Sequence, residues 1–493
     1  MKSMNTIPWG CDRLESTSDE TALKTWGYWQ NRINRASLVM LYEEGIVTDE
    51  EAKTIAEAQT IAEAKQLSMP PISDIMPLEK LLIESCGQLA TLIHTGRSRQ
   101  DIFATLNQAR LREAVMDISE NLNAFRRRLL TLAEAHTETW MPAYTNGVQA
   151  MPITLAFYLS AFLESFERDA DRLTSLWQRV NRCALGTGVL ACSSWLLNRN
   201  RLAELLGFDG PIANGLDSSQ VSLFDVPLEA ASVAGNIAVR IGTLMQDIAQ
   251  QYSQTRPWLL LDSSAAYASS AMPQKRNPGI IQKIRAKASD VVGEMQTAFI
   301  RAHNLNLGMY DNKESVSEDN TRVFVDAVHT LKLADWAFSM LRVHPDRALE
   351  ELESDWTTTM ALAEVLQHRF HLPFRVGHNF SSEMVTAARQ NGWIPKSFPY
   401  AEAQKIYRAV TLRLEGEELE LPLTEAELRE SLSPAFVVKT RVGAGSPAPE
   451  AVAAMLKEQK ARLESDEAQL QGWRNQQKVA QETLDQCFEA LKN

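Results

Sequence analysis

Cysteine is scarce in this chain of 493 residues, and its five cysteines are scattered along the sequence. They are Cys11, Cys86, Cys183, Cys192 and Cys487, so no two of them form a CxxC pair. This spacing supports neither a disulfide framework nor a zinc ribbon, and a reducing cytoplasm is the simplest location. The first residues lack the apolar segment of a signal peptide, and no apolar run reaches the length of a membrane span. We therefore expect a cytoplasmic protein that does not enter a membrane.

Blocks of lysine and arginine are also missing. The formal net charge is −12 and the sequence pI is about 5.3, so the chain offers no broad basic face. General binding to nucleic acid or to an anionic membrane needs such a face, and we expect neither partner. The composition remains compatible with an anionic small molecule, because a local cationic site is common inside an acidic protein.

Strand-like alternation is rare, whereas apolar residues recur at helical spacing in three long segments. The segment 151–180 begins with Pro152 in what we expect to be the first helical turn, and one face of it carries Leu155, Leu159, Phe162 and Phe166. The segments 226–252 and 277–303 have the same character. Together they predict an all-α fold with a long central helical bundle. An ordinary helical scaffold would show the same periodicity, so this pattern alone says nothing about function.

The length is typical of about three domains. We predict an N-terminal helical domain at 1–101, a central long-helix domain at 102–352 that carries oligomerisation and the catalytic loops, and a small C-terminal helical domain at 353–493. The last of these ends in a charged, helix-prone tail extension, where three leucines stand seven residues apart (Leu456, Leu463 and Leu470). That spacing fits a weak coiled-coil heptad or a surface helix with one apolar stripe.

Strong catalytic templates are absent from the sequence, which has no HExxH, GxSxG or GxxxxGK[ST] motif. The stretch GTGVLA at 186–191 contains a GxG but follows no strand-like segment, so we expect a turn between helices. The eight histidines show no ligand spacing; His368 and His371 stand three apart with no carboxylate or thiol cluster near them in sequence. We expect no metal site.

Three polar loops at predicted helix ends remain as candidates. HTGRSRQD, residues 94–101, is either a solvated basic turn or a clamp in which arginine binds carboxylates bidentately. YTNGVQAMP, residues 144–152, either caps the helix that follows or holds an anionic group at a helix N-terminus. SSAMPQKRNPG, residues 269–279, places two hydroxyls, two cations and two amides in one short segment. Each loop taken alone fits a structural role as well as a functional one.

Taken together, HTGRSRQD and SSAMPQKRNP resemble the argininosuccinate lyase and delta-crystallin branch of the fumarase/aspartase superfamily. The superfamily signature is GSSxMPxKxNP, and the HTGRSRND-type motif points to this branch. The segments YEEGIVTDEEA, LPFRVGHNFSSEMVTAARQNG and KTRVGAGSPAPEAV agree with the family in the same order. The resemblance runs from about residue 35 to about residue 455, so the residues after that extend past the usual family end.

The resemblance implies an all-α fold of three helical domains and a homotetramer built around a 20-helix bundle. Each active site would take loops from three different subunits. The implied reaction removes a nitrogen leaving group from an N-substituted aspartate such as argininosuccinate, an anionic small molecule, and releases fumarate without a metal or a cofactor. A proton is taken from the carbon next to a carboxylate, and the resulting carbanion spreads its charge onto that carboxylate as an aci-carboxylate dianion.

The family roles transfer to named residues of this chain. Ser269 matches the catalytic base, which needs nearby cations and amide N–H groups to stabilise its alkoxide. Lys275 and Asn277 match the groups that stabilise the dianion. Asn146 stands at a further catalytic position. The substrate-binding positions are Ser98, Arg99, Gln100, Thr145, Ser270, Gln282 and Tyr310.

The chain also departs from the family pattern. Asn146 replaces a His, and Gln282 replaces the Glu that pairs with it, so a titratable pair becomes an amide pair. Gln100 stands where Asn is usual. Other differences are Ala268 for Gly, Met76 for His, and Ser317 and Asn320 where Gln and Lys are expected in a slightly longer segment. The succinyl end of the substrate therefore keeps most of its partners, whereas recognition of the leaving amine is changed.

Two hypotheses follow. The first is a fumarate-releasing carbon–nitrogen lyase that acts on argininosuccinate or on a related N-succinyl amine or amino acid. The second is a catalytically inactive relative that serves as a scaffold or partner subunit. Retention of Ser269, Lys275 and Asn277 favours the first hypothesis, and release of fumarate from candidate substrates discriminates between the two.

Overall fold

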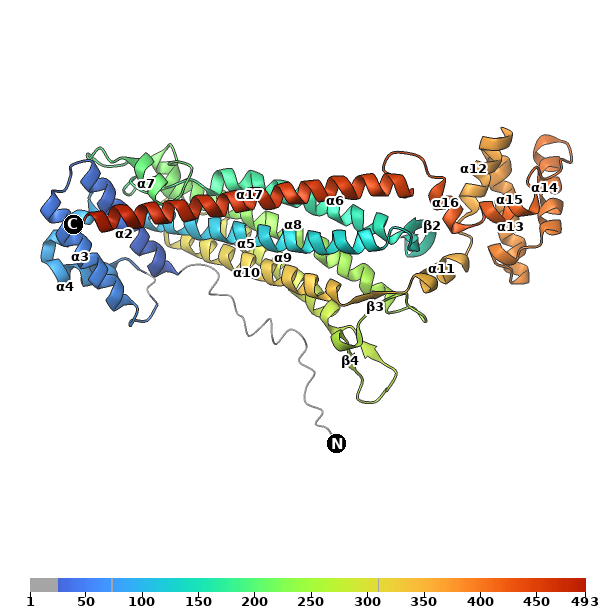
Figure 1. Cartoon of the computed structure of the whole chain (residues 1–493), viewed down its shortest axis with the longest axis horizontal. Helices are drawn as coiled ribbons and strands as arrows, with labels where there is room; N and C mark the ends of the chain where they lie inside the picture. Colours follow the sequence, from blue (N-terminus) through green and yellow to red (C-terminus); the bar gives the residue numbers. More distant parts are fainter. Residues whose placement is uncertain (1–24, 72–73, 309) are drawn as a thin grey trace.

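The computed structural model describes residues 25–71, 74–308 and 310–493, and in the last range it leaves the side chains of 310–315 and 317–321 outside the description. Figure 1 shows an elongated, all-α molecule with one group of helices at each end of a long bundle. The N-terminal end consists of α2 (Trp26–Glu43), α3 (Asp49–Gln66), α4 (Met76–Cys86) and the 3₁₀ helix η2 (Gly87–His94). None of the described helices combines the length and the apolar character needed to cross a membrane.

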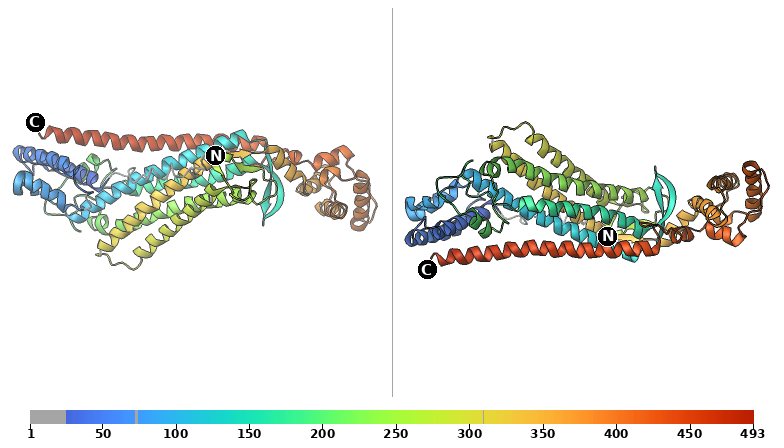
Figure 2. Two further views of the ribbon diagram at one scale, coloured as in Figure 1. Left: turned by 90° about the horizontal axis from the view of Figure 1, so that it is seen from below. Right: turned by 90° about the horizontal axis from the view of Figure 1, so that it is seen from above.

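The central bundle contains the three helices expected from the sequence and two more. Its members are α5 (Arg99–Ala135), α6 (Leu155–Val180), α8 (Ser222–Gln251), α9 (Gly279–Ala302) and α10 (Tyr310–Ser339). Figure 2 shows them running side by side along the long axis of the molecule. Their apolar stripes close a common core, in which the buried Phe125 ring meets the rings of Phe166 and Phe338 edge to face at centroid distances of 5.5 and 5.4 Å. Burial of this continuous stripe is the main stabilisation of helices this long.

A β-hairpin stands where a helix was expected to begin. Residues 140–154 form β1 (Trp140–Thr145) and β2 (Val148–Thr154), paired antiparallel from Trp140 opposite Thr154 to Thr145 opposite Val148. Pro152 therefore lies in a strand, and α6 begins three residues later, where the Thr154 hydroxyl accepts the Phe157 N–H at 3.1 Å. The expectation that Pro152 sits in the first helical turn was wrong, because the Asn-Gly pair at the tip favours a tight hairpin turn.

Shorter elements connect and flank the bundle. They are α7 (Arg199–Leu205), the π-helix η3 (Asp217–Val221), β3 (Leu259–Leu261), η4 (Ser263–Ala265), β4 (Tyr267–Ala268), β5 (Arg276–Asn277), β6 (Leu341–Val343) and α11 (Pro345–Glu353). Strand β3 pairs antiparallel with β6, and β4 pairs antiparallel with β5. The far end of the molecule has its own small core and consists of α12 (Thr359–Phe370), α13 (Phe374–Asn391), η5 (Pro395–Ser397), α14 (Tyr400–Glu415), α15 (Glu425–Ser431) and α16 (Pro434–Lys439).

The tail forms one helix, α17 (Pro449–Ala490), which differs from the expected extension of the C-terminal domain. It runs back along the central bundle and ends beside α2, so that the first and the last helix of the described chain lie side by side (Figures 1 and 2). The apolar stripe interpretation holds, because Leu456, Leu463 and Leu470 are all buried against the bundle. Trp473 stacks on Trp177 with the ring centroids 4.2 Å apart.

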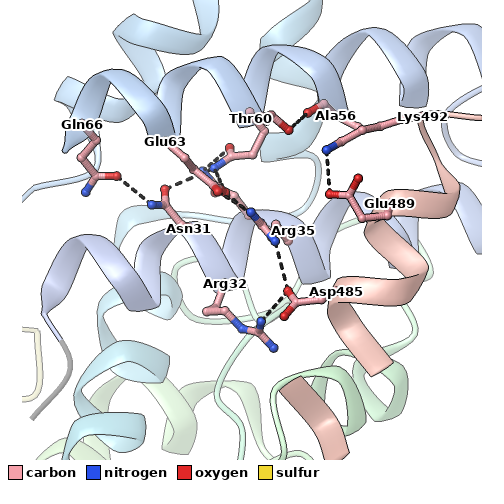
Figure 3. A network of polar contacts seen from close by, with 12 residues as sticks. Asn31, Arg32, Arg35, Ala56, Thr60, Glu63, Gln66, Asp485, Glu489 and Lys492 are labelled. Atoms are coloured by element: carbon pink, nitrogen blue, oxygen red, sulfur yellow. Dashed lines mark hydrogen bonds and ion pairs between the residues drawn. The ribbon is translucent and has the colours of Figure 1, made fainter. Parts of the chain in front are cut away.

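Ion pairs fix the end of α17 to the N-terminal helices. Asp485 accepts from Arg32 at 2.7 Å and from Arg35 at 3.0 Å, and Arg35 also pairs with Glu63 of α3 (Figure 3). Phe488 lies under the Arg35 guanidinium at 4.7 Å. The helix therefore links both ends of the molecule and packs outside the domain to which the sequence assigned it.

Candidate active site

The loop at 94–101 ends as the N-terminus of α5. Ser98 is the N-cap: its hydroxyl accepts the Gln100 N–H at 3.1 Å, and its own N–H donates to Asp101 Oδ1 at 2.8 Å. This capping box fixes Ser98, Arg99 and Gln100 on the first turn, where the free N–H groups and the helix dipole favour an anion. The structure thus brings these three predicted substrate-binding residues together.

Asp101 holds this first turn against the glycine turn at 186–188. Its second oxygen, Oδ2, accepts the N–H groups of Gly186, Thr187 and Gly188 at 3.0, 3.1 and 3.1 Å. Both glycines have positive φ, at 84° and 59°, which lets the three N–H groups converge on one oxygen. Asp101 is fully buried, and its burial raises the pKa of the carboxyl to about 6, against the opposing effect of the N–H donors and of Arg97. The expected turn at 186–191 is therefore present and serves as an anion cradle for Asp101.

The two arginines of the loop have different environments. Arg97 is buried and donates to Asn34 Oδ1 at 3.1 Å and to Ser37 Oγ at 2.9 Å, so the interpretation of the loop as a solvated turn is wrong for this residue. Burial lowers its pKa to about 10. Arg99 is more than half exposed, lies over the Phe103 ring at 5.5 Å and forms an ion pair with Asp74. Arg99 is therefore the guanidinium that can reach a substrate carboxylate.

The signature loop connects β4 to β5 and is exposed along most of its length. Ser269 lies at its base, where the backbone N–H of Ser269 donates to the Lys275 carbonyl at 3.3 Å. The Ser269 hydroxyl oxygen accepts the N–H groups of Ala271 and Met272 at 3.3 and 3.1 Å. Two backbone donors on one hydroxyl oxygen stabilise negative charge there, which is what a serine base requires.

Lys275, Ser270 and Asn277 lie on the same small hairpin as Ser269. Lys275 is exposed, and its ammonium group has no ion pair or side-chain hydrogen bond to another residue that the structure describes. Asn277 donates through Nδ2 to the Tyr267 carbonyl at 3.2 Å, a contact that closes the hairpin. Ser270 is exposed on the loop itself. This hairpin thus carries an exposed hydroxyl and an exposed ammonium group.

The remaining predicted residues lie on other elements. Thr145 and Asn146 are exposed at the tip of the β1–β2 hairpin, and Asn146 has a positive φ of 53°. Gln282 lies on the first turn of α9 and accepts from Arg285 at 2.7 Å. Tyr310 is the first residue of α10, and its side chain, like those of Ser317 and Asn320, lies outside the described residues.

One chain does not bring all these groups to one place. Helix α5 has 37 residues, so its two ends are about 55 Å apart. The Ser98–Gln100 turn lies at one end of it, and the hairpin that carries Thr145 and Asn146 follows the other end (Figure 1). The β4–β5 hairpin projects from the bundle on the side of this second end. The three predicted loops are therefore separated within a single subunit.

Sequence reasoning missed the roles of three residues that build the site. The role of Asp101 depends on contacts with residues 85 to 87 positions away, and the only signal was the GxG turn, which matched no motif. Gln220 donates through Nε2 to Gln100 Oε1 at 2.9 Å, from a π-helix that periodicity does not indicate. Glu351 accepts from the Tyr144 hydroxyl and, at 3.1 Å, from Gln149, and so fixes the base of the β1–β2 hairpin.

Comparisons with known proteins show which family this chain resembles. A family model described as Lyase matches residues 35–293. The argininosuccinate lyase of Methanosarcina acetivorans is 30% identical over 97% of this chain and 96% of its own length. The argininosuccinate lyase 1 of Shouchella clausii is also 30% identical, over 97% of this chain and 95% of its own length. Matches of this extent leave too few residues outside them for the tail to be an extension past the family end, which corrects that expectation.

Solved structures show the same fold. An EDDS lyase in complex with formate superposes with a TM-score of 0.86 at 25% identity, covering 98% of this chain and 96% of that protein. A variant of EDDS lyase with bound fumarate gives a TM-score of 0.85 at 26% identity over the same shares.

Proposed function

Because this chain belongs to the argininosuccinate lyase branch of the fumarase/aspartase superfamily and is a carbon–nitrogen lyase that eliminates fumarate, we propose that its substrate is an N-substituted aspartate. Argininosuccinate is the default candidate, and a related N-succinyl amine or amino acid is the alternative. The observation that carries the proposal is the geometry of the signature loop. Backbone N–H groups converge there on the Ser269 hydroxyl, and the same loop carries Lys275, whose ammonium group pairs with none of the side chains that the structure describes.

Ser269 removes the proton from the carbon next to a substrate carboxylate. Its alkoxide is stabilised by the N–H groups of Ala271 and Met272 and, when the loop covers the substrate, by the ammonium group of Lys275. The exposed β4–β5 hairpin suits a lid that excludes water during this step. Exclusion of water strengthens each of these electrostatic contacts.

Lys275 and Asn277 stabilise the charge that develops on the substrate carboxylate. Loss of the proton turns that carboxylate into an aci-carboxylate dianion. A cation and a hydrogen-bond donor placed beside this carboxylate stabilise the negative charge as it forms. The dianion then collapses, the carbon–nitrogen bond breaks, and fumarate and the amine are released. Asn277 acts from the base of the hairpin, and Lys275 acts from the exposed loop.

The first turn of α5 binds the substrate carboxylates. Ser98, Arg99 and Gln100 combine a helix N-terminus with a guanidinium and an amide, which are the donors that carboxylates prefer. Arg99 exchanges Asp74 for the substrate when it binds. Thr145, Ser270 and Tyr310 complete the proposed contacts from the other loops.

The separation of these loops leads us to propose a homotetramer in which each active site combines loops of different subunits. One chain keeps the α5 turn and the β1–β2 hairpin about 55 Å apart, whereas packing of several bundles side by side can bring different ends together. Mixed assemblies of Ser269→Ala and Arg99→Ala chains should then regain activity, because some sites receive both native residues. A stable monomer in light scattering, or mixtures no more active than either variant, would contradict the shared site.

Recognition of the leaving amine depends on Asn146 and Gln282. Neither amide titrates in the physiological range, so they cannot supply a proton to the departing nitrogen as an ionisable pair can. We propose that the nitrogen leaves already protonated, or takes its proton from water, and that argininosuccinate is a poorer substrate than another N-substituted aspartate. The similarity to an EDDS lyase as well as to argininosuccinate lyases supports a variable leaving group.

A substrate panel tests the proposed function. The ultraviolet absorbance of fumarate is followed after the chain is mixed with argininosuccinate, EDDS and a set of N-succinyl amines and amino acids, with Ser269→Ala as the blank. Release of fumarate from at least one compound supports the proposal, and the ranking of kcat/KM identifies the amine. Release from none of them favours an inactive scaffold instead. If argininosuccinate ranks first at about 10⁴ M⁻¹s⁻¹ or more, the altered-specificity part of the proposal is wrong.

A further inference from the structure

The π-helix η3 places a buried glutamine against the substrate-binding turn. Gln220 is 1% exposed, and its Nε2 donates to Gln100 Oε1 at 2.9 Å. Hydrogen bonds within the π-turn hold its backbone. The Ser222 N–H donates to the Asp217 carbonyl, and the Ser222 hydroxyl donates to the same carbonyl at 3.0 Å. Ser219 anchors it to the Val189 carbonyl at 2.8 Å. A π-turn of this kind re-aims one side chain and is frequent at functional sites.

The contact determines which half of the Gln100 amide is left for a ligand. A primary amide has one accepting oxygen and one donating NH₂ group. Gln220 occupies the oxygen, so the NH₂ group of Gln100 is the half that can face the site. Arg99 and the N–H groups at the start of α5 are donors as well. The whole turn is therefore set to bind an acceptor such as a carboxylate.

Resting on the proposed function, we propose that Gln220 is a positioning residue that orients the Gln100 amide to donate to a substrate carboxylate. Gln100 is one methylene longer than the Asn usual in the family, so it has more rotamers to lose on binding. The buried partner removes that freedom before the substrate arrives, and preorganised donors bind more tightly.

The role is separable from that of a fold-stabilising contact. The backbone of the turn is already held by the Ser98 cap and by the four N–H bonds to Asp101. Removing Gln220 leaves those bonds in place, so the backbone of the turn should keep its position while the Gln100 side chain loses its buried donor.

A double-mutant cycle tests the proposal, with kcat and KM measured by fumarate release on the best substrate of the panel. Gln220→Met keeps length and volume but removes the amide. We expect KM to rise by about three- to tenfold, with kcat changed less, because Gln100 keeps its amide but loses the fixed orientation of that amide, which costs less than the complete loss of a hydrogen bond to a charged group. In the Gln100→Met background the same substitution should have no further effect, because its target is gone. Equal and additive effects in both backgrounds would overturn the proposal.

The substitution Gln220→Glu should reverse the orientation of the Gln100 amide and provides a second test. A carboxylate can only accept, so it turns the NH₂ group of Gln100 inward and its oxygen toward the substrate carboxylate. We expect KM to rise by about tenfold or more. Gln88→Glu, an exposed change at the same end of the molecule, controls for added negative charge and should leave KM unchanged. Thermal unfolding of every variant separates this effect from loss of folding.

The outcomes keep the two proposals apart. A native chain that releases fumarate from no compound contradicts the proposed function before any variant is made. A native chain that is active, with Gln220→Met and Gln220→Glu both at native KM, contradicts only the role of Gln220.

Discussion

The two loops that carry most of the candidate site are built in opposite ways. The α5 turn rests on the fully buried Asp101, which ties it to the 186–188 turn through three N–H bonds. The signature loop between β4 and β5 is exposed and is held by a few bonds at its base, among them Asn277 to the Tyr267 carbonyl. Substitutions that disturb the α5 turn should therefore lower the stability of the fold, whereas substitutions in the signature loop should change activity with little effect on stability.

The largest expected effect is on the signature loop. Ser269→Ala and Lys275→Ala should each lower kcat by about 10²–10³ or more, because each residue acts on charge that develops in the transition state. The melting temperature should stay at the native value, because the loop is exposed. Gln274→Ala, at an exposed neighbouring position, is the matched control and should keep near-native turnover. Near-native kcat in either variant would rule out the assigned mechanism.

In the α5 turn, by contrast, the substitution Asp101→Asn should lower the stability of the fold. An asparagine has one accepting oxygen, so it leaves either the Ser98 N–H or the three N–H groups of the 186–188 turn facing an NH₂ group. We expect a loss of about 1–3 kcal/mol in the free energy of unfolding, together with a raised KM. Urea denaturation and steady-state kinetics measure the two effects. A variant with native stability would show that the buried carboxylate does not hold the turn.

The pH dependence of the unfolding free energy tests whether the buried Asp101 carboxyl holds the α5 turn. Burial raises the pKa of Asp101 to about 6 in the folded chain, above the ordinary value of 3.8 for an aspartate. Between these values the folded state holds a proton that the unfolded state has lost, so stability falls as pH rises through this window. The contribution is about 3 kcal/mol for a shift of this size. Asp101→Asn should lack this dependence, so the difference in unfolding free energy between native and variant chains should widen as pH is lowered from about 7 to about 4. A difference that narrows would mean that the N–H donors and Arg97 outweigh burial.

Sequence reasoning reached the exposed loop more fully than the buried one. Ser269, Lys275 and Asn277 lie within nine residues of one another, so a local motif contains the whole hairpin. The function of Asp101 and Gln220 depends on partners that are distant in sequence, and helical periodicity carries no such information. The hairpin at 140–154 was missed although Asn146 and Gly147 are a strong turn signal, because the apolar residues around Pro152 were assigned to the helix that follows. The direction of α17 could not be predicted from the sequence either, because its leucine stripe does not specify which surface the helix covers.

The smallest expected effect concerns Asn146, where the role in the turn and the role in the site can be separated. Asn146 and Gly147 both have positive φ, at 53° and 76°, a conformation that Asn and Gly tolerate best. Asn146→Gly keeps this turn and removes the side chain, so the melting temperature should not change, while kcat/KM should fall by about tenfold if the amide contacts the substrate. Asn146→Ala removes the same amide but strains the turn by about 1–2 kcal/mol. Equal kcat/KM in both variants, with only Asn146→Ala less stable, would assign the loss to the amide. Native kcat/KM in Asn146→Gly would show that Asn146 serves the hairpin alone, and that the matched change with Gln282 follows from turn geometry and not from the leaving group.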